Sequence, residues 1–134
     1  MRYTYLYILT LLMGASSANA QDSIERTEKM NVSIGSLTLS SVKVDEIKFP
    51  PSKKAPMHKH SCPVVGQIVK GVCLLQVQGE DPRILHEGDI FYEPADVPIL
   101  HFDNYSETEI MEFMAYYLAN GQGALTEILP AEKR

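Results

Sequence analysis

The feature that most constrains the fold of this 134-residue chain is a series of short apolar runs of strand length, separated by turn-forming residues. Eight such runs follow one another, at residues 32–39, 42–49, 64–69, 72–78, 83–85, 90–93, 99–102 and 110–118. Glycine, proline, aspartate and asparagine stand between them, and these residue types favour turns. Short strands at such close intervals predict an all-β, single-domain antiparallel barrel or sandwich.

The last of these runs, residues 110–118, is apolar on both faces apart from Glu112. Its periodicity alone fits either a buried strand or a helix. Phe113, Tyr116 and Tyr117, together with the lack of helix-capping residues, favour a strand. A strand that is packed on both faces needs a second sheet over it, and closure into a barrel provides one.

The first 20 residues have the pattern of a secretory signal peptide. Arg2 supplies a positive start, residues 3–13 form an apolar run, and Ala18-Asn19-Ala20 fits the small-x-small cleavage pattern. The apolar run is short for a bilayer span, and a membrane anchor is the alternative interpretation. We expect cleavage after Ala20 and a periplasmic or secreted protein that does not remain at the membrane.

Cleavage leaves 134 − 20 = 114 residues, which is enough for one domain. We expect a lead-in with the first strands over 21–41, the barrel core over 42–118 and a C-terminal tail over 119–134. The net charge of −5 becomes −6 once Arg2 is removed, and the acidic residues are scattered. Because the chain has no basic stripe, we expect no nucleic-acid partner.

His58-Lys59-His60 is the motif that points to chemistry. Side chains at i and i+2 leave a strand on the same face, so the two imidazoles can bind one divalent metal ion. A third donor from a neighbouring strand would complete the site. The chain has no glycine-rich phosphate loop, no Gly-x-Ser-x-Gly elbow and no His-Glu-x-x-His motif. No catalytic residue can be named from the sequence.

Residues 55–104 resemble the two conserved motifs of the cupin superfamily. The matching positions are His58, His60 and Gly71 in the first motif, and Gly88, Pro94 and Asn104 in the second. The resemblance implies a small antiparallel jelly-roll barrel, in many members with one metal ion inside. The chain departs from the motifs at two ligand positions: Val64 replaces a glutamate and Ile99 replaces a histidine. Asp96 replaces the second glycine of the second motif.

His101 lies two residues beyond Ile99, so both share one face of a regular strand. We therefore expect a metal site formed by His58, His60 and His101. If Pro98 instead breaks the strand, His101 turns outward. Glu93 and Glu112 are two alternatives for the missing carboxylate.

Cys62 and Cys73 leave two interpretations open. If Gly71 closes a hairpin, Cys73 faces the region of Val69, well away from Cys62. A barrel can nevertheless bring unpaired strands together, and an oxidising compartment permits a disulfide. Cys62 could also be a metal ligand, because it follows His60 by two residues, although a packed thiol is the simpler interpretation.

Two functional hypotheses follow. The first is an exported metal-dependent enzyme of oxygenase or isomerase type, with Fe, Mn, Ni or Zn and a small molecule bound in the barrel. The second is a non-catalytic cupin that binds a small ligand or a partner, with a degenerate metal site. The resemblance also implies pairing through edge strands, so we expect a homodimer in which residues 24–32 add to a neighbour's sheet.

Overall fold

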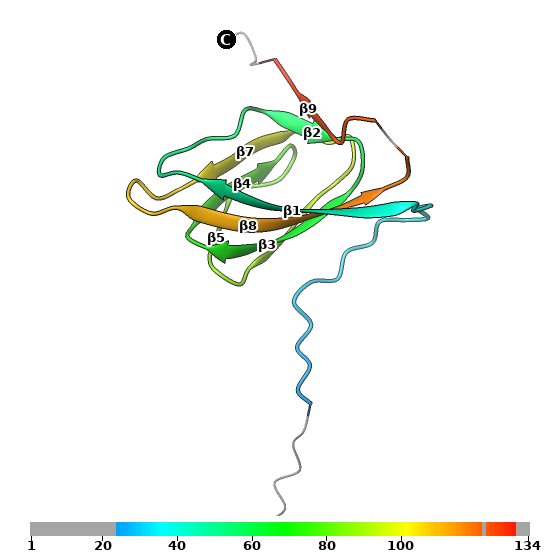
Figure 1. Ribbon diagram of the computed structural model, residues 1–134, viewed down its shortest axis with the longest axis horizontal. Coiled ribbons are helices and arrows are strands. Elements are labelled where there is room, and N and C mark those ends of the chain that lie inside the picture. The colour runs from blue at the N-terminus through cyan, green and yellow to red at the C-terminus, as the bar shows by residue number, and fades with distance from the viewer. Residues whose placement is uncertain (1–23, 122, 131–134) are drawn as a thin grey trace, which may run out of the picture.

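The computed structural model describes residues 24–121 and 123–130, and strands are its only regular secondary structure (Figure 1). The strands are β1 (Ser41–Phe49), β2 (His58–His60), β3 (Val64–Lys70), β4 (Cys73–Val77), β5 (Arg83–Leu85), β6 (Ile90–Glu93), β7 (Ile99–Asn104), β8 (Met111–Ala119) and β9 (Thr126–Ile128). Within these residues no helix is long and apolar enough to cross a membrane. The predicted signal peptide lies outside the described residues.

The strands form two antiparallel sheets that pack against each other as a jelly roll (Figure 1). One sheet has four strands in the order β1-β8-β3-β6, and the other has five in the order β5-β4-β7-β2-β9. Buried side chains alternate with half-buried or exposed ones along β8, as the period of a strand requires. The predicted all-β barrel of cupin type is confirmed.

Aromatic side chains join the two sheets at the centre of the barrel. Phe102 on β7 and Phe113 on β8 have ring centroids 4.7 Å apart, so the contact crosses from the five-stranded to the four-stranded sheet. Phe91 and Phe49 pack edge-on against this pair, with centroid distances from 5.1 to 6.4 Å. Each ring buries a large apolar area, and edge-to-face packing is the arrangement that ring quadrupoles favour.

Gly71 joins β3 to β4, which belong to different sheets, so it does not close a hairpin between paired strands. Its φ of +85° suits glycine, and a Cβ there would lie 2.8 Å from the carbonyl oxygen of Ile110. The hairpin on which the cysteine argument depended is therefore absent. Cys62 and Cys73 are both buried free thiols in the structure.

Two segments differ from the sequence prediction at the ends of the domain. Residues 32–39, predicted as a strand, form none, and their apolar side chains are partly exposed. Conversely, the predicted tail contributes β9, which pairs with β2 in the register His58↔Ile128 and His60↔Thr126. This pairing matters because it covers the free side of β2, the strand that carries both histidines.

Candidate metal centre

His58 and His60 point into the barrel from β2, as the motif predicted. The two residues are 8% and 4% exposed, and Lys59 between them faces outward to pair with Glu127 of β9 at 3.3 Å. The two ring centroids are 5.0 Å apart. The alternation of a strand thus places both imidazoles on one buried face.

Hydrogen bonds to backbone carbonyls orient both imidazoles. The Nδ1–H of His58 donates to the carbonyl oxygen of Pro56 at 2.8 Å, whereas Nδ1 of His60 lies 3.1 Å from both the carbonyl oxygen of Leu125 and the hydroxyl oxygen of Thr126. A carbonyl oxygen only accepts, so Nδ1 carries the proton in His58, and the Leu125 carbonyl favours the same tautomer in His60. The remaining nitrogen, Nε2, is therefore the one available to a ligand inside the barrel.

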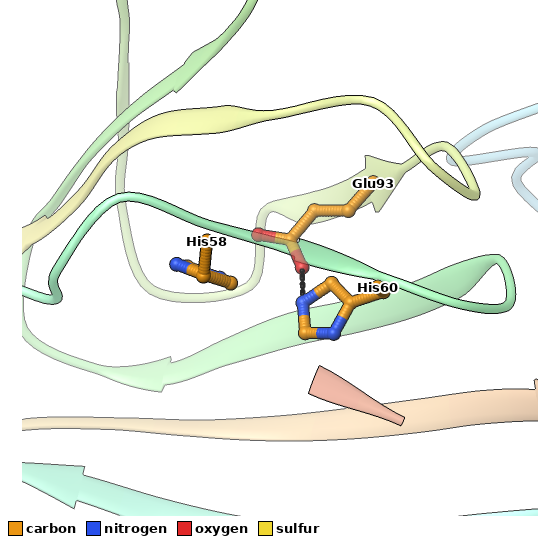
Figure 2. Close-up of side chains that lie close together, drawn as sticks. All are labelled: His58, His60 and Glu93. Atoms are coloured by element: carbon orange, nitrogen blue, oxygen red, sulfur yellow. Dashed lines mark ion pairs between the residues drawn. The ribbon is translucent and has the colours of Figure 1, made fainter. Parts of the chain in front are cut away.

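Glu93 completes a group of three buried potential metal ligands (Figure 2). One ligand atom from each of His58, His60 and Glu93 lies within 4.8 Å of the other two. Glu93 is 3% exposed, and its Oε2 lies 2.9 Å from Nε2 of His60. Its second oxygen, Oε1, is buried and has no hydrogen-bond partner among the described residues.

The register of the sheet explains why Glu93 reaches this place. Glu93 on β6 pairs directly with Val64 on β3, the position where the cupin motif has its glutamate. The carboxylate has therefore moved across one strand while staying at the same level of the barrel. The sequence indicates Glu93 only as one of two alternatives, because strand pairing cannot be read from the motif spacing.

The turn after β6 holds Glu93 against β2. Asp96 donates its backbone N–H to the carbonyl oxygen of His60 at 2.7 Å, and His60 and Ala95 form a parallel bridge. Asp96 has a φ of +60°, the left-handed conformation that glycine adopts easily and aspartate tolerates. The substitution of the motif glycine by Asp96 therefore preserves the turn.

These residues fit a divalent transition-metal ion. Two ligand atoms at about 2.1 Å from one ion and at right angles to each other lie about 3 Å apart. The 2.9 Å between His60 Nε2 and Glu93 Oε2 agrees with that separation. A divalent cation would be coordinated by both atoms and would also provide a partner for the unpartnered Oε1.

The structure differs from the three-histidine prediction at His101, which lies on the outer face. Gln76 pairs with His101 but Val77 pairs with Ile99, so Leu100 is an extra residue in β7. This β-bulge shifts the alternation by one, so that Ile99 and Phe102 are buried while His101 is exposed. The His101 side chain is 45% exposed and its Nδ1 bonds Oδ2 of Asp103 at 2.9 Å.

The other candidates also lie outside the group. Ile99 is fully buried opposite His58, where it packs without a donor atom. Glu112 pairs with Lys48 on the outer face at 3.3 Å. Cys62 is buried but does not belong to the group of converging ligand atoms, and burial raises the pKa of its thiol.

The three ligands open into a pocket of about 190 Å³ between the two sheets. Most of its lining side chains are apolar, and it contains no lysine or arginine among the described residues. Tyr117 and Thr126 are the polar residues beside the ligands. Burial, then the charges of Asp45 and Glu93, raises the pKa of Tyr117, so its hydroxyl stays protonated. Thr126 comes from β9, which sequence analysis did not anticipate.

Solved structures confirm the fold. A cupin-like protein from Thermotoga maritima is 23% identical with a TM-score of 0.57, over 66% of this chain and 64% of that one. The DMSP lyase DddQ from Ruegeria pomeroyi is 19% identical with a TM-score of 0.57, over 66% and 43%. An oxalate oxidase in complex with glycolate is 20% identical with a TM-score of 0.55, over 66% and 46%.

The chain spans less than two thirds of the length of these structures, and the identities are low, so they establish the fold alone. A search of curated protein sequences finds no match. The sequence profile of the cupin domain matches residues 45–125, which covers most of the nine strands and all three candidate ligands. This chain belongs to the cupin family.

Proposed function

We propose that this protein is an exported, metal-dependent cupin that binds a small molecule at a divalent transition metal held by His58, His60 and Glu93. One observation carries the proposal: two buried imidazoles, each oriented by hydrogen bonds at Nδ1, converge in the barrel on a buried carboxylate that has an unpartnered oxygen. Two histidines and one carboxylate are the ligand set of non-haem Fe(II) sites, with Mn, Ni and Zn as competitors for the same donors.

The chain's own residues would divide the work in the following way. His58, His60 and Glu93 would hold the ion, whose contribution when bound is Lewis acidity and open coordination positions for substrate. The Tyr117 hydroxyl, kept protonated, is placed to donate a hydrogen bond to an oxygen of the bound molecule. The apolar walls would exclude water from the reacting atoms. These features support an oxygenase- or isomerase-type activity.

Metal analysis tests the proposal. Protein purified without a metal-affinity tag and reconstituted with Fe(II), Mn(II), Ni(II) or Zn(II) is expected to retain about one ion per chain. The double variant His58→Ala/His60→Ala is expected to retain none, while the exposed histidines His86 and His101 serve as matched alanine controls that keep the ion. A metal-free wild-type protein after each reconstitution would refute the proposal.

A non-catalytic ligand-binding role is the second candidate, and the apolar replacements favour it. Val64 and Ile99 are both buried where the family motif has metal ligands. If this candidate is correct, a small molecule binds equally well to the metal-free and the metal-loaded protein. Ligand binding that requires the metal favours the first candidate.

Export and self-association belong to the same proposal. The signal-like leader supports export, and an intact mass corresponding to a start at Gln21 in the exported fraction would test it. β1 is an edge strand, and the preceding segment exposes Val32, Ile34, Leu37 and Leu39 at 39–45%. We propose that this segment pairs with a second copy to form a homodimer. Light scattering showing a monomer at micromolar concentration would refute this arrangement.

A further inference from the structure

We infer that the pocket selects a small molecule with one negative charge. One end of this molecule is an oxygen-bearing group that binds the metal, and the other end is a flat apolar group about the size of one ring. This inference rests on the proposed metal site, for which it names the class of ligand. Three independent features of the pocket carry it: the order of the lining residues along the strands, the size of the space, and the balance of charge.

The lining changes from polar to apolar along the four-stranded sheet. Glu93 and Tyr117 both pair with Val64 and form one row across the sheet. Phe91 and Ala115 both pair with Gly66 and form the next row on the same face. Two residues along a strand span about 6.7 Å, so an apolar surface begins about one ring diameter from the metal ligands.

Small residues create the space in that second row. A Cβ on Gly66 would lie 2.0 Å from Cζ of Phe91, so the phenyl ring rests directly on the β3 backbone. Ala115 beside it presents only a methyl group to the pocket. Phe113 and Phe102 form the far wall and hold Phe91 in place with centroid distances of 6.1 and 5.1 Å. The result is a recess with aromatic walls next to the metal ligands.

The volume of the pocket matches a ligand body of about one ring. The pocket holds about 190 Å³. An apolar protein cavity of about 150 Å³ takes up a benzene molecule. One six-membered ring with a small oxygen-bearing group therefore fits within this volume.

The charges favour a head group with one negative charge. A divalent ion with the Glu93 carboxylate and two neutral imidazoles has a net charge of +1, which a monoanion neutralises. No lysine or arginine of the described residues lines the pocket, and the nearby ammonium of Lys43 lies 5.1 Å from the Tyr117 ring centroid and pairs with Asp45. A dianion would leave an unbalanced negative charge against phenylalanine side chains, which is costly.

Hydroxamates of two sizes test the inference, because benzohydroxamate and acetohydroxamate share the same monoanionic, oxygen-donating head. Calorimetric titrations of the Zn(II)-loaded protein with each compound, and with oxalate as the dianion, give the affinities. The ratio of the two affinities, benzohydroxamate over acetohydroxamate, is expected to be about 10- to 100-fold larger for the Zn(II)-loaded protein than for free Zn(II), because the protein buries the ring of benzohydroxamate. Oxalate is expected to bind more weakly than benzohydroxamate.

Variants on two faces of β1 provide the matched control. Ile47 lines the pocket, whereas Val44 lies on the outer face and is 47% exposed. Ile47→Trp is expected to abolish the preference for benzohydroxamate while the zinc content stays at one ion per chain. Val44→Trp is expected to retain the preference.

The outcomes separate this inference from the proposal on which it rests. Wild-type protein that binds no zinc refutes the proposed metal site itself. Zinc-loaded protein that binds both hydroxamates equally, or oxalate most tightly, refutes the ligand class and leaves the metal site standing. Should Ile47→Trp lose its zinc or unfold, the comparison of the three ligands on wild-type protein still decides.

Discussion

Replacing Glu93 by glutamine separates metal binding from folding. Glutamine has nearly the same shape, and its side-chain amide can donate a hydrogen bond to Nε2 of His60, 2.9 Å from the present Oε2. The metal-free variant is therefore expected to be about as stable as the parent. The charge at the metal changes, because the only anionic ligand in the group of three is lost. Glu112→Gln, on the outer face, is the matched control.

The size of the effect follows from linkage. A metal at 100 times its dissociation constant stabilises the folded protein by about 2.7 kcal/mol. Removing a residue that only hydrogen-bonds to a metal ligand weakens the affinity for the metal by about 10- to 100-fold. Removing the charge of a ligand itself should therefore weaken the affinity for the metal by at least about 100-fold. With affinity reduced about 100-fold, the same metal concentration stabilises by only about 0.4 kcal/mol.

Thermal unfolding with and without metal measures this difference. For a domain of about 114 residues each kcal/mol corresponds to a shift of about 4 °C, so the metal should raise the parent's Tm by about 11 °C. The shift for Glu93→Gln should be only about 2 °C. Glu112→Gln should keep the full shift. A full metal-induced shift in Glu93→Gln, or its loss in Glu112→Gln, would show that the ion does not bind at this group.

Three further predictions address the outward histidine, the packing of the pocket and the buried thiol. His101→Ala should leave the metal-induced shift in Tm unchanged, because the side chain points away from the ligands. If His101→Ala reduces this shift as much as His60→Ala does, His101 faces the metal and β7 has no bulge that turns it outward. Gly66→Ala should cost about 3 kcal/mol in denaturant unfolding, since its Cβ would lie 2.0 Å from the Phe91 ring and 2.5 Å from the backbone carbonyl oxygen of Met114; a cost below about 1 kcal/mol would mean that both can move aside. Burial, then the charges of Glu93 and Asp103, raises the pKa of Cys73 from 9.0 to about 12. The unfolded thiol therefore loses its proton at lower pH than the folded one, and the free energy of unfolding should fall as pH rises from 9 towards 12, by at most about 1.4 kcal/mol per pH unit. Cys73→Val under reducing conditions should lack this part of the decline, and an identical pH profile for both proteins would contradict it.

The strands of the barrel could be predicted because their signal is local. Alternating apolar residues and turn-forming breaks placed eight runs, of which seven correspond to strands β1 and β3–β8. Residues 32–39 are a similar run, with apolar residues at 32, 34, 37 and 39, and yet form no strand in the structure. Alternation only states that a segment suits a half-buried sheet, whereas a strand also needs a neighbour with free hydrogen-bonding groups. Conversely, the three residues of β9 are too few to show a pattern.

The two histidines of the candidate site could be predicted for the same local reason, since the spacing i, i+2 sets a shared face once a strand forms. The third ligand could not. Glu93 lies beside the two histidines because β6 pairs with β3 in one particular register. His101 lies on the opposite face because one extra residue, Leu100, reverses the alternation in β7. Register and bulges are set by hydrogen bonding between strands distant in sequence, and a shift of one residue moves a side chain to the opposite face.

By itself, then, the sequence determined the fold class, the family and the histidine pair, because each depends on residues close together in the chain. Only the tertiary structure decided which carboxylate faces those histidines, which histidine is excluded, and how the phenylalanines enclose the pocket. These relations arise where two sheets meet, with contacts such as that between Phe102 and Phe113 made across the barrel. Their physical origin is the packing of one sheet on another, which no spacing within a single motif records.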